Sequence, residues 1–160
     1  MRHITVKVDA VLHARSGDIY ATIADYRHGH PNILPKKYLY DLHVEEGGYG
    51  AGTIIRFKSR ILGMERSFYQ RVSEPEPGKI LVEQDIDSGK PDGSTFTVKP
   101  TIQEGQTHVE ISTLITISPG FQGLIERMII PLALAPIYRQ ELQLLEAVAQ
   151  KKATMMVQHP

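Results

Sequence analysis

The sequence predicts an α+β fold in which one curved antiparallel sheet of six or seven strands surrounds a long, kinked C-terminal helix. Three observations lead to this prediction. Residues 118–150 are the one stretch long enough to form a long helix. Most of the preceding chain consists of short alternating segments separated by turns. A short amphipathic segment after the first strand predicts a helical insert. A sheet with one apolar face needs a cover, and a single long helix provides one.

The N-terminal segment predicts a strand followed by this insert. Residues 4–13 alternate apolar and polar side chains, as in a half-buried strand. Ser16 is a favourable N-cap residue, and Asp18 would lie in the first turn of a helix that ends near Tyr26. The glycine and prolines of residues 27–35 indicate a loop.

Six further strands are predicted at residues 38–45, 53–61, 64–73, 80–86, 94–100 and 107–117. The connections between them are short, so the strands should form an antiparallel meander, with the first strand closing its far edge. Six or seven twisted strands curl. A curled sheet contacts a rod-shaped helix along only part of its length, and we therefore expect a small-molecule cavity between them.

The apolar face of the C-terminal helix changes side along its length. The residues that share one face in the first half are Phe121, Leu124, Ile125, Met128, Ile129, Leu132 and Ala135. After Pro136 the apolar face consists of Tyr138, Leu142, Leu145 and Ala149. A straight helix would not bury both faces against one sheet. Because Pro131 and Pro136 each lack an N–H group, we expect a kink between Arg127 and Arg139, with the apolar face buried on both sides of it.

The middle of this helix, residues 128–138, is apolar nearly all round. Such a segment is either deeply buried, or covers a cavity, or meets a partner. It is too short to span a bilayer, which takes about 20 residues.

Composition limits the class of protein. One domain over residues 1–150 is expected, with a disordered tail at 151–160. The chain has 18 basic and 18 acidic residues, which argues against nucleic-acid binding. It has no cysteine, which excludes disulfides, thiolate catalysis and cysteine-bound zinc. The N-terminal residues do not form a signal peptide, so we expect a cytoplasmic protein. We expect it to be a monomer or homodimer without stable membrane insertion.

Three polar clusters have ordinary explanations. Asp41, His43 and Glu45 alternate on one strand and are expected to face water rather than to form a general base. His28 and His30 are too few to bind zinc, so a solvated loop is expected. The glycines of residues 47–52 join two strands and lack the P-loop lysine, which indicates a turn or bulge. We expect no metal and no nucleotide or other cofactor.

Several segments also carry a family resemblance. They are residues 8–26 (VDAVLHARSGDIYATIADY), the loop 30–35 ending in Leu-Pro, and residues 44–57, 72–85, 95–100 and 136–149. They resemble the polyketide cyclase/dehydrase and lipid-transport family (SRPBCC), part of the START-related, birch-pollen-allergen-like helix-grip superfamily. The resemblance covers nearly the whole chain and implies a single START-like, helix-grip domain. It implies no universal catalytic residue, so none is assigned.

Candidate ligand-binding residues lie on the expected inward faces of the strands and helix. Arg66 shares a strand face with Phe68, and would either bind a ligand carboxylate or phenolate or reach water along its stem. Tyr40 and Tyr138 are candidate hydroxyl donors. The complete predicted set is Tyr40, Leu42, Ile55, Phe57, Arg66, Phe68, Phe96, Val98, Val109, Ile111, Met128, Leu132, Ala135 and Tyr138.

Three functions remain open at this point. The first is binding, carriage or sensing of a small hydrophobic ligand (a lipid, polyketide or isoprenoid-like molecule), favoured because no catalytic set is evident. The second is an aromatase/cyclase-type enzyme, which an inward, hydrogen-bonded Arg–His–Tyr group would favour. The third is a protein-interaction module, which an exposed apolar patch on Ile130, Leu134 and Ile137 would favour.

Overall fold

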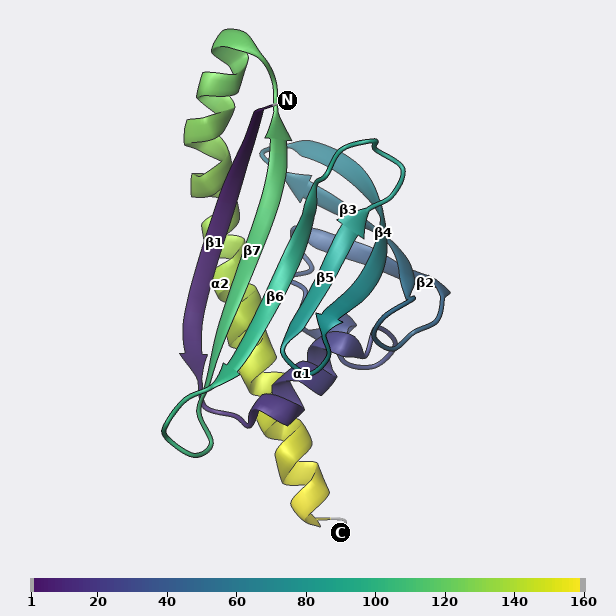
Figure 1. Cartoon of the computed structure of the whole chain (residues 1–160), viewed down its shortest axis with the longest axis vertical. Coiled ribbons are helices and arrows are strands. Elements are labelled where there is room, and N and C mark those ends of the chain that lie inside the picture. The colour runs from purple at the N-terminus through teal and green to yellow at the C-terminus, as the bar shows by residue number, and fades with distance from the viewer. Residues whose placement is uncertain (1, 159–160) are drawn as a thin grey trace.

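The computed structural model describes residues 2–158 and has one seven-stranded antiparallel sheet with a long helix against it (Figure 1). The strands are β1 (Arg2–Leu12), β2 (Leu39–Glu46), β3 (Ile54–Ile61), β4 (Met64–Glu76), β5 (Ile80–Asp85), β6 (Gly93–Pro100) and β7 (Thr107–Ile117). The helices are α1 (Ser16–Ala24), the 3-10 turn η1 (His30–Asn32) and α2 (Gly120–Gln158). The predicted α+β fold class is confirmed.

The strand order is β1-β7-β6-β5-β4-β3-β2. Strands β2 to β7 form the predicted meander, because each connection is too short for a crossover. The first strand closes one edge by pairing with the last, from Arg2 opposite Ile117 to Leu12 opposite Thr107. The other edge, β2, is irregular, with a register shift near Asp41, whose φ is 54°.

The glycine-rich turn of residues 47–52 joins the sheet to the end of α1. The Tyr26 N–H donates to the Gly48 carbonyl and the Gly50 N–H donates to the Ala24 carbonyl, each at 2.9 Å. Gly48 and Gly50 both have positive φ, which a larger side chain would disfavour. These hydrogen bonds hold the turn against the end of α1. No residue of the turn lines the cavity described below.

Helix α2 is continuous through Pro131 and Pro136, and its axis bends where the green turns of Figure 1 meet the yellow-green turns. The predicted bend is therefore present. The helix also runs on to Gln158, so residues 151–158 are helical rather than a disordered tail, since no glycine or proline interrupts them. Residues 159–160 lie outside the described chain.

The prediction that the first-half apolar face of α2 is buried is wrong. Phe121 and Leu132 are each 77% exposed, and Leu124, Ile125, Met128 and Ile129 are exposed as well. The buried side of α2 instead runs through Gly123, Ile137 and Glu141, with Ile130 and Leu134 partly buried on it. These residues are three, four or seven apart, so one side of the helix faces the sheet throughout. The periodicity correctly placed these apolar residues on one face of the helix, but it did not show which face packs against the sheet.

The densest core lies at the end of the sheet where α1 packs. Ile19 and Ile23 of α1, Val98 of β6, Val109 of β7 and Leu145 of α2 are completely buried there. By length and composition, α2 contains a window apolar enough to cross a membrane. Of that window 11% is buried, whereas the second half of α2 packs into the core.

Candidate ligand-binding site

A cavity of about 210 Å³ lies between the concave side of the sheet and the inner side of α2. Alternation along the strands places every second side chain on this side of the sheet. The apolar residues that line the cavity include Leu39, Leu42, Ile55, Phe57, Phe68, Phe96, Ile111, Ile130, Leu134 and Ile137. The cavity therefore favours an apolar molecule over most of its wall.

A buried polar group lies at the inner end of the cavity. The Tyr26 hydroxyl donates to Oε1 of Glu83 at 2.6 Å. His30 Nδ1 donates to the Ile23 carbonyl at 2.7 Å, which leaves Nε2 facing the same Glu83 oxygen at 3.4 Å. The rings of Tyr26 and His30 stack with centroids 4.5 Å apart. Burial raises the pKa of Tyr26 well above its usual value, so this phenol stays protonated and acts as a donor.

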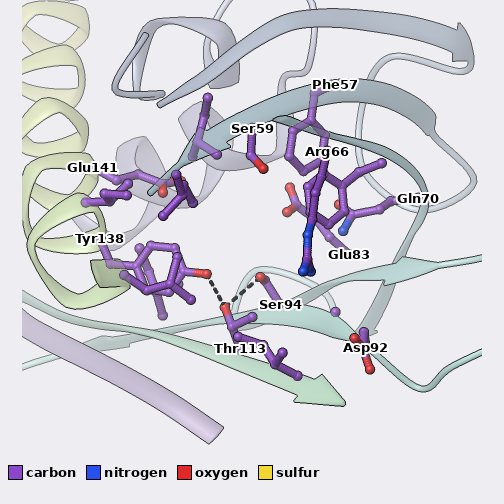
Figure 2. A pocket seen from close by; sticks show the side chains of 18 of the residues that line it. Phe57, Ser59, Arg66, Gln70, Glu83, Asp92, Ser94, Thr113, Tyr138 and Glu141 are labelled. Carbon is purple, nitrogen blue, oxygen red and sulfur yellow. Dashed lines mark hydrogen bonds between the residues drawn. The ribbon is translucent and has the colours of Figure 1, made fainter. Parts of the chain in front are cut away.

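Glu141 of α2 is the least compensated of these groups. It is 3% exposed and lines the cavity, opposite strands β3 to β6 (Figure 2). Within residues 2–158 its carboxyl group has no hydrogen bond or ion pair. Burial, and secondly the charge of Glu83, raise the pKa of Glu141 well above its ordinary range. An acid held in its neutral form inside an apolar cavity is suited to hydrogen bonding with a ligand.

Three hydroxyl groups form a chain along the wall near Glu141. The Tyr138 hydroxyl lies 2.7 Å from Oγ1 of Thr113, which lies 2.8 Å from Oγ of Ser94 (Figure 2). Burial raises the pKa of Tyr138 to about 12. The chain crosses from α2 to β7 and β6, so it fixes the helix to the sheet and also offers hydroxyl groups to the cavity.

The outer end of the cavity carries a cation and two carboxylates. Arg66 is exposed and borders the cavity, with its side chain extending toward it in Figure 2. Gln70 donates to Asp85 at 2.7 Å, and burial raises the pKa of Asp85. Asp92 accepts from the Thr116 N–H at 3.0 Å. Gln70 Oε1 is the one completely enclosed side-chain polar atom without a partner among the residues described, whereas Glu141 faces the cavity.

Comparison with solved structures gives close matches in fold. The KanY protein, solved by NMR, is 25% identical, with a TM-score of 0.78 over 94% of this chain and 99% of its own. The Zhui aromatase/cyclase from Streptomyces sp. R1128 is 13% identical, with a TM-score of 0.75 over 95% and 96% of the two chains. A START superfamily protein from Mycobacterium smegmatis is 15% identical, with a TM-score of 0.67 over 94% and 99%.

The chain has the helix-grip fold. The resemblance to the START-related superfamily is thus confirmed for the fold. A scan against protein-family models and a search of curated proteins found no match.

Eight of the predicted ligand-binding residues line the helix-grip cavity, and six do not. The eight are Leu42, Ile55, Phe57, Arg66, Phe68, Phe96, Ile111 and Tyr138. Val98 and Val109 share the inward faces of Phe96 and Ile111 but lie nearer α1, which fills the space there. Ala135 packs at the margin of the core.

The other three residues lie outside the cavity. Met128 and Leu132 belong to the exposed side of α2. The Tyr40 hydroxyl hydrogen-bonds to Glu65 on the outer surface, where Arg60 also binds that carboxylate. Tyr40 is next to the irregularity of β2, and this shift of register turns its side chain away from the cavity.

The two loop histidines have opposite environments, contrary to the prediction that both are solvated. The His28 side chain is 85% exposed, whereas His30 is 2% exposed. The turn η1 places His30 against Tyr26 and Phe96, and its hydrogen bond to Ile23 compensates for burial. By contrast Asp41, His43 and Glu45 face water as predicted. Within residues 2–158 no group of three or more histidines and carboxylates has a metal-binding arrangement.

Glu83 and Glu141 were missed by sequence reasoning. Glu83 shares the inward face of β5 with Leu81, so a charged residue at an inward position was the available signal. Glu141 follows Ile137 by four residues, one turn along the same helix side. That signal was hidden because the buried side of α2 was assigned to its more apolar face.

Proposed function

We propose that this helix-grip protein binds a small, mainly apolar ligand that carries a hydrogen-bonding group at one end. The observation that supports this is the cavity itself, which has an apolar wall and a buried polar inner end formed by Glu83, Glu141 and Tyr138. Such a division fixes the orientation of a ligand as well as its size. Carriage or sensing of a lipid, polyketide or isoprenoid-like molecule fits this arrangement, and likeness to START and aromatase/cyclase structures supports it.

Arg66 supports a second polar contact at the mouth of the cavity. Its guanidinium is positioned to bind a carboxylate or phenolate, which it would contact with two N–H donors. The balanced charge of the chain, 18 basic and 18 acidic residues, supports a function without nucleic acid. Cytoplasmic localisation stays a prediction.

Filling the cavity tests this proposal. Ala133 lines the cavity, while the adjacent Leu132 is exposed on the opposite side of α2. We expect native mass spectrometry of the purified wild-type protein to detect a bound small molecule. Ala133→Phe should abolish its binding, and Leu132→Phe should leave it bound. Absence of any co-purified or added apolar ligand from the wild-type protein would contradict the proposal.

A cyclase-type enzyme is the second candidate, and one observation favours it. The cavity is lined by a carboxylic acid held neutral, Glu141, and by an imidazole, His30, which are the kinds of group that acid–base chemistry requires. The Arg–His–Tyr group that would favour an enzyme is present only in part, because His30 interacts with Tyr26 and Glu83 rather than with Arg66. With an identified ligand, an enzyme would release a product of altered mass, and Glu141→Gln would bind the ligand without converting it.

The interaction-module hypothesis is not supported on its own criterion. Ile130, Leu134 and Ile137 line the cavity instead of forming an exposed patch.

A further inference from the structure

Two buried carboxyl groups from different elements face the inner end of the cavity. Glu83 belongs to β5 and is 6% exposed, and Glu141 belongs to α2 and is 3% exposed. Both line the cavity together with Tyr138 (Figure 2). From this arrangement we propose that the ligand carries a protonated amine, which binds between Glu83 and Glu141. The inference rests on the proposed function, because it specifies the ligand of the same cavity.

The inner end of the cavity has more acidic than basic side chains. Among the described residues that line the cavity, the basic side chains are His30 and Arg66. His30 lies against Glu83, and Arg66 borders the exposed mouth, where Asp85 and Asp92 also lie. None of the ion pairs among residues 2–158 includes Glu141. A cation supplied by the ligand would favour the ionised form of Glu141 and would offset the cost of burying both carboxylates.

The hydrogen-bonding capacity of the inner end also matches an amine. A primary ammonium group has three N–H donors and no acceptor. The carboxyl oxygens of Glu83 and Glu141 accept hydrogen bonds, as does the hydroxyl chain that begins at Tyr138. Tyr138 and Glu141 are three residues apart on α2, and both line the same cavity as Glu83. An alcohol offers one donor and no charge, so it would leave part of this set without a partner.

The test compares two probes with the same carbon skeleton, 4-phenylbutylamine and 4-phenyl-1-butanol, bound to the full chain and measured by calorimetry at pH 7. We expect the amine to bind at least tenfold more tightly than the alcohol. An alcohol that binds as tightly as the amine would overturn the inference while leaving the proposed function intact. Failure of both probes, and of longer apolar amines and alcohols, would instead contradict the proposed function.

Single substitutions locate the amine. Glu141→Gln and Glu83→Gln should each reduce the preference for amine over alcohol to below threefold, while the alcohol affinity of each variant reports whether its cavity has folded. Asp85→Asn is the matched control, since it removes a carboxylate at the outer end of the same cavity. It should leave the preference unchanged. A loss of preference in Asp85→Asn but not in Glu141→Gln would show that the amine binds at the mouth, and would overturn the inference.

Discussion

The two halves of α2 are both rich in apolar residues but bury them very differently. In the second half, Leu142 and Leu145 are enclosed between α1 and the sheet. In the first half, Phe121, Met128 and Leu132 face outward. The difference arises because one side of the helix faces the sheet along its whole length, whereas the apolar side changes at the prolines. A helical stripe therefore indicates a shared face, and only the neighbouring elements determine whether it is covered.

The same contrast separates two carboxylates of this helix. Glu126 in the first half accepts hydrogen bonds from Ser118, and these lower its pKa. Glu141 in the second half is buried, and burial raises its pKa. One helix thus carries two acids whose effects on stability change with pH in opposite directions.

The largest expected effect concerns the buried leucine. Leu145→Ala should lower the free energy of unfolding by about 2–5 kcal/mol, because it leaves a cavity in a closely packed core. Leu132→Ala, the same change on the exposed side, should alter it by less than about 0.5 kcal/mol. Urea denaturation of both variants checks the comparison. Similar losses in the two variants would show that the first half of α2 is also covered in solution.

The second prediction concerns the pH dependence that Glu141 imposes. The raised folded-state pKa means that Glu141 binds a proton more readily in the folded protein than in the unfolded chain. The contribution of Glu141 to stability is therefore most favourable below its unfolded pKa near 4.5. Stability should then fall as the pH rises from there toward the raised pKa. The variant Glu141→Gln should remove this decline, which denaturation at a series of pH values would detect. A difference between Glu141→Gln and the wild type that does not grow with pH over this range would contradict the assignment.

The sequence predicted the fold well and the site only in part, for physical reasons. Alternation in the strands placed Ile55, Phe57 and Phe96 on the inward side, since a strand residue has only two sides to choose from. The inward position of Glu83 on β5 contradicts the rule that charged residues face water. Its partner His30 is distant in sequence, and only the tertiary fold brings the two together.

The third prediction concerns the bend in α2. Pro131 is unable to donate to the Arg127 carbonyl and Pro136 to the Leu132 carbonyl, and each proline costs about 3 kcal/mol or more in a straight helix. Replacing both with alanine should straighten the helix and displace Ile130, which lines the cavity. We expect about tenfold weaker ligand binding, with a smaller effect on thermal stability because the restored hydrogen bonds offset the lost fit. Calorimetry with 4-phenylbutylamine measures this, and Pro77→Ala in the β4–β5 turn is the control. Unchanged binding by the double variant would contradict the prediction.

The smallest expected effect concerns the start of the same helix. The Ser118 N–H and hydroxyl both donate to the Glu126 carboxylate at 2.7 Å, which joins β7 to the first turns of α2. In Glu126→Gln one of these acceptors becomes an amide nitrogen, so we expect a loss of about 1 kcal/mol in the free energy of unfolding at pH 7. The neighbouring exposed substitution Arg127→Gln should have little effect.

The pH dependence of the Glu126→Gln loss is what distinguishes the first half of the helix from the second. The stabilisation by Glu126 is present above its unfolded pKa near 4.5 and is lost as the pH falls through its lowered folded-state value. The difference in unfolding free energy between wild type and Glu126→Gln should therefore shrink toward zero in acid. The difference between wild type and Glu141→Gln should also become small there, because Glu141 is then neutral in both the folded and the unfolded state. Raising the pH should enlarge both differences with opposite sign: Glu126→Gln destabilises and Glu141→Gln stabilises. Differences of the same sign at neutral pH would show that the two carboxylates share one environment.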